Sequence, residues 1–188
     1  GFPIDGYSPA MDLLRVLVGN YPSSRLWRAL RGDDPAAYMV DADLRVMSDV
    51  GRLSLYVGLA DVVEPERAWR RLVDVVRGLC SRLPTDGELR WARRVARLEV
   101  TRRMLDPERA LRFLVSRWPL VGGQHLAATD PYGSLLAGLD APGSEDIARA
   151  ARCVLSAGSA ALSVVGDVGA WSLDSALAHV DDVCAAER

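Results

Sequence analysis

The sequence predicts a single α+β domain over residues 1–188, a two-layer sandwich with a mixed, mostly antiparallel sheet covered on one face by helices. Two alternating runs, residues 38–44 and 53–59, predict an antiparallel strand pair because every second residue is apolar. Apolar residues at helical spacing dominate the segments between and after these runs. We expect further strands at residues 1–3 and 161–166, so both ends of the chain contribute to the sheet.

The N-terminal part is expected to begin in a strand and continue with two helices. Gly1-Phe2-Pro3 lacks a Met and resembles the tail of a strand, which suggests the second half of a longer chain or of a two-chain assembly. Leucine and valine at helical spacing predict a helix over residues 9–19. Ser23 is the predicted N-cap of a short helix over residues 24–31.

Each of the next three helices has its own start signal. Pro65 suits the first turn of one helix. Thr85 and Glu88 form a capping-box pattern that opens the next. Asp106-Pro107 caps the third. Its predicted buried face comprises Ala110, Leu111, Leu114, Val115 and Trp118.

The C-terminal part carries two more helix starts and a final strand and helix. Asp130-Pro131 and Ser144 are the predicted starts of two short helices. Residues 161–166 are apolar and predict the last strand, and residues 173–186 predict an amphipathic terminal helix. The clustering of helices between the strands favours a sheet with one covered face.

Composition indicates a soluble globular protein. The chain is 49% hydrophobic and 26% charged, and no apolar run reaches the roughly 18 residues that a membrane span needs. A net charge of −2 provides no general attraction to nucleic acid or to an anionic membrane. All 23 basic side chains are Arg, which is typical of a GC-rich bacterial genome. Cys80, Cys153 and Cys184 are far apart and show no CxxC spacing, so we expect reduced thiols in a cytoplasmic protein.

A short motif connects the second helix to the first strand of the pair. The sequence reads S-S-R-L from Ser23 to Leu26, then Arg31, and seven residues later Tyr38 at the start of a strand. This pattern and the order of the elements resemble one half of a pitrilysin/insulinase-type metallopeptidase, over about residues 1–168. Within that family it resembles the C-terminal-half domain of the non-zinc subunit type, as in mitochondrial-processing-peptidase-like proteins.

The resemblance implies a role in peptide cleavage without a metal of its own. Family members bind zinc through an inverted HxxEH motif in another domain or subunit, so zinc is expected in a homologous HxxEH-bearing partner, as in a heterodimer. By analogy, Arg31 and Tyr38 would hydrogen-bond the substrate's backbone carbonyl near the scissile bond. Arg and a phenolic hydroxyl both donate hydrogen bonds, which suits an oxygen on which negative charge develops. We interpret Arg25 as structural, tying its turn to neighbouring backbone.

The chain also departs from the family pattern. Where the family usually has Glu-Lys-x-Gly, this chain has Gly32-Asp33-Asp34-Pro35, and Pro35 has a restricted φ. The altered loop favours a second hypothesis, a catalytically inert scaffold relative that acts through assembly. Arg31 would then only complement the end of its helix, and Tyr38 would be an ordinary strand aromatic.

Other site patterns are weak or absent in the sequence. His125 and His179 have no histidine partner at zinc-helix spacing, so we expect no catalytic zinc, no other cofactor and no catalytic residue in this chain. No GxSxG, phosphate loop or GxGxxG motif is present. Asp33-Asp34 could act as paired carboxylates, but their turn context favours solvated acids. Arginine pairs between Arg67 and Arg117 alternate with acidic residues, which disfavours nucleic-acid binding.

Overall fold

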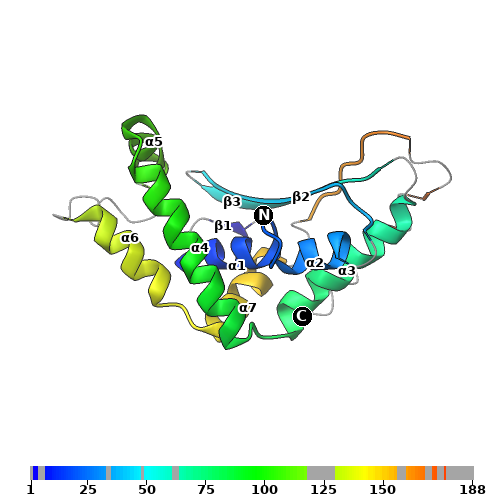
Figure 1. Cartoon of the computed structure of the whole chain (residues 1–188), viewed down its shortest axis with the longest axis horizontal. Helices are drawn as coiled ribbons and strands as arrows, with labels where there is room; N and C mark the ends of the chain where they lie inside the picture. Colours follow the sequence, from blue (N-terminus) through cyan, green and yellow to red (C-terminus); the bar gives the residue numbers. More distant parts are fainter. Residues whose placement is uncertain are drawn as a thin grey trace.

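The structure is a computed structural model that confirms the α+β fold class. It describes residues 2–3, 7–32, 35–47, 49–60, 64–117, 130–155, 160–167, 171, 172 and 176. In chain order the elements of this described part are β1 (Phe2–Pro3), α1 (Pro9–Val18), α2 (Arg25–Arg31), β2 (Met39–Val46), β3 (Val50–Gly58), α3 (Pro65–Ser81), α4 (Asp86–Met104), α5 (Pro107–Arg117), α6 (Pro131–Asp140) and α7 (Ser144–Val154). Figure 1 shows the sheet as one layer and the helices gathered on one side of it.

The sheet is antiparallel, with the strand order β1-β3-β2. The predicted pair is present in register, with Val40 opposite Val57 and Ala42 opposite Leu55. The apolar residues of both runs face the helices, as period-two alternation requires. Both strands extend past the predicted runs toward their connection, since β2 ends at Val46 and β3 begins at Val50.

The core is centred on α1, which lies between the sheet and the other helices (Figure 1). Its residues are buried on nearly every side, from Ala10 to Val18 with the exception of Asp12. A helix that is apolar all round is stable only inside a core. Full burial of each leucine or valine side chain contributes about 1.5–3 kcal/mol, so α1 is the main source of apolar stabilisation.

The turn after α1 lies directly against the outer edge of β2. A Cβ at Gly19 would lie 2.6 Å from the Cβ of Ala42, so only glycine permits this approach. Asn20 has a positive φ of 78°, and its side-chain oxygen accepts a hydrogen bond from the Ala42 backbone N–H. This contact covers part of an edge that would otherwise expose its backbone donors.

Most predicted helix starts are confirmed. Thr85 and Glu88 form a reciprocal capping box at α4, and the Asp130 side chain accepts a hydrogen bond from Gly133 N–H at α6. Ser23 is not the N-cap of α2. Ser24 holds that position, because its N–H closes a turn onto the Tyr21 carbonyl at 2.8 Å and the helix begins one residue later. No described helix combines the length and apolarity required to traverse a membrane.

Two predictions in the second half of the chain are wrong. Residues 161–166 form no strand; Val165 is 97% exposed and the segment borders a cavity instead of joining the ladder. The predicted buried face of α5 is also incorrect, since Leu111 is 64% exposed and Val115 is 61% exposed. Among the described elements α4 is the main neighbour of α5, so one narrow side of α5 is covered. The predicted helix over residues 173–186 and Trp118 lie outside the described residues, apart from the buried Ala176.

Candidate functional site

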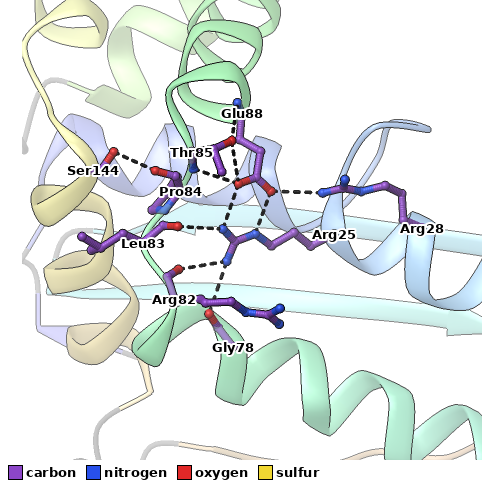
Figure 2. Close-up of polar contacts among 9 residues, drawn as sticks. All are labelled: Arg25, Arg28, Gly78, Arg82, Leu83, Pro84, Thr85, Glu88 and Ser144. Carbon is purple, nitrogen blue, oxygen red and sulfur yellow. Dashed lines mark hydrogen bonds and ion pairs between the residues drawn. The ribbon is translucent and has the colours of Figure 1, made fainter.

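The S-S-R-L segment positions α2 through Arg25, at the start of that helix. Its guanidinium forms two hydrogen bonds with the Glu88 carboxylate, from Nε at 3.0 Å and from a terminal nitrogen at 3.1 Å. It also donates to the carbonyls of Gly78, Arg82 and Leu83 at the end of α3, at 3.2–3.5 Å. Figure 2 shows these bonds converging on one guanidinium. The interpretation of Arg25 as a structural tie to neighbouring backbone is confirmed.

Glu88 connects α4 to α2 through one carboxylate. It completes the capping box of α4 by accepting from Thr85 N–H at 3.0 Å, and it also pairs with Arg25 and Arg28 of α2 (Figure 2). The hydrogen bond from Arg25 is the largest cause that lowers the pKa of Glu88 to about 2. The ionised carboxylate therefore holds α2 in place against the start of α4.

The end of α2 places Arg31 above an aromatic ring. The Arg31 guanidinium carbon lies 4.1 Å from the ring centroid of Trp27, a cation–π distance. A Cβ at Gly32 would meet the Arg28 carbonyl oxygen at 2.5 Å, so the chain leaves the helix at a position that needs glycine. Further along, Ala36 and Ala37 both donate backbone N–H groups to the Leu30 carbonyl, at 2.7 and 3.1 Å.

Tyr38 is held at the start of β2 by its backbone and by its ring. Its N–H donates to the Gly58 carbonyl at 2.9 Å. Its ring lies over the Gly58 backbone, because a Cβ at Gly58 would lie 2.7 Å from the ring carbon that bears the hydroxyl. The side chain is nevertheless 61% exposed. Tyr38 is thus an exposed donor on a well-defined backbone.

Tyr38 borders a cavity of about 520 Å³. The walls are formed by the adjoining ends of β2 and β3, by one side of α3, and by residues 162–167 and 171. Arg31 is not one of the lining residues. The structure therefore brings Tyr38 to the cavity and places Arg31 over Trp27, outside it. That both residues contact one substrate remains a prediction.

Two tryptophans in the cavity wall were not identified as site residues from sequence. Trp69 lies in α3, and Trp171 lies after α7. Their ring centroids are 6.2 Å apart at an interplanar angle of 55°. The Trp69 indole nitrogen is buried and has no hydrogen-bond partner among the described residues. A tryptophan near the start of an amphipathic helix, close to a strand end, is the signal that could have indicated a binding surface.

A second cavity, of about 490 Å³, lies between α1, the edge of β2 and α4. Its charged lining residues are Asp12, Arg15, Asp41, Asp43, Arg45, Glu99 and Arg103. Arg15 pairs with Glu99, and Arg45 pairs with Asp43 at 2.8 Å. Tyr21 also donates to Glu99 at 2.7 Å; burial, and next this bond, raise the pKa of Tyr21 to about 12. These groups bind one another, so we consider the first cavity the better candidate site.

The metal-ligand predictions are only partly covered by the structure. His125, His179, Asp33 and Asp34 lie outside the described residues. Within the described ranges, no group of three or more His, Cys, Asp and Glu side chains could hold a metal ion. Cys80 is a free thiol buried in the core, Cys153 is a half-buried free thiol, and Cys184 is not described.

Comparison with known proteins identifies structural neighbours that share this fold. No protein-family model matches the chain, and no curated protein matches it in sequence. Among solved structures, a protein from Bordetella pertussis Tohama I described as a putative zinc protease is 21% identical, with a TM-score of 0.58. The match covers 80% of this chain and 81% of that one.

Two further structures support the same fold. A protease from Helicobacter pylori is 18% identical, with a TM-score of 0.62, over 79% of this chain and 34% of that one. A structure described as the inactive peptidase domain of a zinc protease from Bordetella parapertussis is 20% identical, with a TM-score of 0.60, over 78% and 76%. The chain therefore has the fold of zinc-protease-like domains, and it spans about a third of the length of the Helicobacter protein.

Proposed function

We propose that this chain is the substrate-binding, non-zinc half of a zinc metallopeptidase of the pitrilysin/insulinase type. It would complete the active site of a homologous, HxxEH-bearing partner and cleave peptides only together with that partner. The shared fold with protease domains supports the class, and the similarity to an inactive peptidase domain supports a part without its own metal site. The processing-peptidase-like subtype is part of the proposal and rests on the S-S-R-L, Arg31 and Tyr38 pattern.

The observation that carries the proposal is the placement of Tyr38. An exposed phenol at the edge of a cavity is a ready hydrogen-bond donor for an incoming peptide. Its backbone is fixed by Gly58, and the chain before it is fixed by two bonds to the Leu30 carbonyl. Such preorganisation is what stabilisation of a developing oxyanion requires, because little further ordering is needed during the reaction.

The chemistry would be divided between the two halves. Zinc in the partner would polarise the scissile carbonyl and activate a water molecule. Tyr38 would donate its phenolic hydrogen to the carbonyl oxygen of the bound peptide. Arg31 would donate to the same region of the substrate once it is lifted from the Trp27 ring, so its present stacked position is a resting one. The cytoplasm is the proposed compartment, since the three cysteines suit a reducing environment.

Reconstitution with the partner tests this function. The partner would first be recovered from the native cells by pull-down and identified by mass spectrometry as an HxxEH-containing chain. Arg31→Ala should then lower kcat for peptide cleavage at least about tenfold, as expected for loss of an oxyanion donor. Tyr38→Phe, which removes only the hydroxyl, should also lower kcat. Arg70→Ala and Tyr56→Phe are matched exposed controls and should leave kcat unchanged.

An inert scaffold is the second candidate, favoured by the Gly32 to Pro35 loop and by the similarity to an inactive peptidase domain. On this hypothesis the fold serves assembly and makes no contact with the scissile bond. A double variant, Arg31→Ala with Tyr38→Phe, would then form the complex normally and leave cleavage unaffected. That result would refute the substrate-binding role and establish the scaffold.

A further inference from the structure

The walls of the 520 Å³ cavity select for an uncharged occupant. Its sides are provided by Trp69 and Leu72 of α3, Leu55 and Val57 of β3, and Trp171. Asp167 is the single charged residue among the described lining residues. Aliphatic and aromatic side chains exclude ions but bind apolar groups, since burial removes apolar surface from water. A large aliphatic or aromatic side chain is therefore the chemistry that these walls accept.

The size and location of the cavity indicate which molecule would bring such a side chain. A volume of about 520 Å³ is within the ordinary range for small-ligand sites and exceeds what one methyl or isopropyl group would fill. Tyr38, the residue proposed to bind the substrate carbonyl, is one of the residues that line the cavity. A peptide held by Tyr38 would therefore have a neighbouring side chain directly above this opening.

One polar group in the wall has no partner within the described part of the chain. The Trp69 indole nitrogen is buried and donates to no acceptor there. A buried donor without an acceptor is unfavourable, and proteins rarely leave one unsatisfied. A peptide that enters the cavity carries backbone carbonyl oxygens, which are suitable acceptors for an indole N–H.

We infer that this cavity is a specificity subsite for a large apolar residue of the peptide substrate, close to the scissile bond. Trp69 and Trp171 contact the side chain, and the Trp69 indole N–H donates to a backbone carbonyl of the same peptide. This inference rests on the proposed function, because Tyr38 provides the link to the scissile bond. It adds a substrate class, peptides with an aromatic or large aliphatic residue at that position, and two residues that select it.

Peptide binding to the chain alone tests the subsite without a partner. The probe is a blocked alanine pentapeptide with phenylalanine at its centre, and the matched control has glutamate there. Indole N–H signals of the 15N-labelled protein report on its five tryptophans. Trp69→Phe identifies the Trp69 signal by its loss. The phenylalanine peptide should shift the Trp69 signal with a Kd on the order of 1 mM, typical of a single anchoring side chain, and the glutamate peptide should not.

Two variants separate the subsite from general hydrophobic binding. Ala60 is exposed and lines the cavity, so Ala60→Trp should fill it and abolish the shift without disturbing the core. Trp69→Phe retains an aromatic wall but removes the hydrogen-bond donor. It should weaken binding of the phenylalanine peptide about five- to tenfold, as measured by calorimetry. Equal shifts with both peptides, an undiminished shift in Ala60→Trp, or no shift up to several times that Kd would each overturn the inference.

Failure of this inference and failure of the proposed function give different results. If the subsite is wrong, the Trp69 signal does not respond selectively, while Arg31→Ala still lowers kcat in the reconstituted enzyme. If the proposed function is wrong, Arg31→Ala leaves kcat unchanged, whether or not the peptides shift the Trp69 signal. In the reconstituted enzyme a correct subsite also predicts that Ala60→Trp lowers kcat/KM for phenylalanine substrates but not for alanine substrates.

Discussion

Replacement of Arg25 by methionine tests how α2 is held in place. Arg25→Met keeps a long unbranched side chain but removes the charge and every hydrogen bond of the guanidinium. The bidentate pair with Glu88 spans 63 residues of sequence and lies mostly out of solvent. Loss of hydrogen bonds between charged groups in such a place costs about 1.5–3 kcal/mol.

The remaining bonds of Arg25 add less to this value. The carbonyls of Arg82 and Leu83 are contacted in an exposed setting, so water can replace the guanidinium there. The Gly78 carbonyl is partly buried and keeps the Arg82 backbone N–H as a donor at 3.1 Å, so loss of the guanidinium there costs at most about 1 kcal/mol. We therefore expect Arg25→Met to lower the free energy of unfolding by about 2–4 kcal/mol at pH 7.

Arg28→Met is the matched control, because Arg28 contacts the same carboxylate at 3.0 Å but is 57% exposed. Exposed ion pairs contribute about 0–1 kcal/mol, so this variant should differ little from the parent. Urea denaturation at low ionic strength, followed by circular dichroism, gives both free energies of unfolding. A difference of less than about 0.5 kcal/mol between the two variants would refute the structural role of Arg25.

The pH dependence provides an independent check on the same pair. The pKa of Glu88 is about 2 in the folded chain and about 4.3 when unfolded, so its stabilisation is complete above the unfolded value. It is lost as the pH falls from about 5 through 2. After a reduction for solvent screening, the difference in free energy of unfolding between the parent and Arg25→Met should decrease by about 1 kcal/mol from pH 7 to pH 3. An unchanged difference would mean that the pair with Arg25 does not keep the Glu88 carboxylate ionised.

Two further predictions concern burial and a tyrosine. Leu13 of α1 is fully buried, so Leu13→Ala should cost about 2–5 kcal/mol in urea denaturation, whereas Leu111→Ser on the exposed side of α5 should change stability by less than about 0.5 kcal/mol. A large loss of stability in Leu111→Ser would instead indicate that Leu111 lies on a buried face, as the sequence predicted. Glu99→Gln removes the charged acceptor of Tyr21, so its pKa, about 12 in the parent, should fall toward 10 while burial keeps it raised in part. Alkaline titration of phenolate absorbance measures this, and coincident curves for parent and variant would contradict it.

Helix starts and the strand pair were predictable because their signals are local. The capping box at Thr85 and Glu88 involves four consecutive residues, and Asp130 caps α6 through a contact three residues away. The strand pair needed only period-two alternation in two runs joined by a short turn. Such signals depend on backbone geometry within a few residues, so they hold whatever surrounds them.

The candidate site was predictable only in part. The S-S-R-L frame pointed to Arg25 as a structural residue and to Tyr38 as a site residue, and both positions follow from nearby sequence. Nothing in the spacing indicated that the Arg25 guanidinium would meet Glu88, because the order of packing of α2 and α4 is not encoded locally. The same holds for Trp69 and Trp171, whose rings meet only through the folding of the intervening helices.

The sequence by itself determined the α+β class, most helix starts and the antiparallel strand pair, through propensity, caps and alternation. Tertiary structure alone decided what each apolar face meets. Residues 161–166 have strand-like composition but form no ladder, and Leu111 has helical spacing but is 64% exposed. Burial and ladder pairing both depend on two surfaces that meet. One stretch of sequence specifies only one of these surfaces.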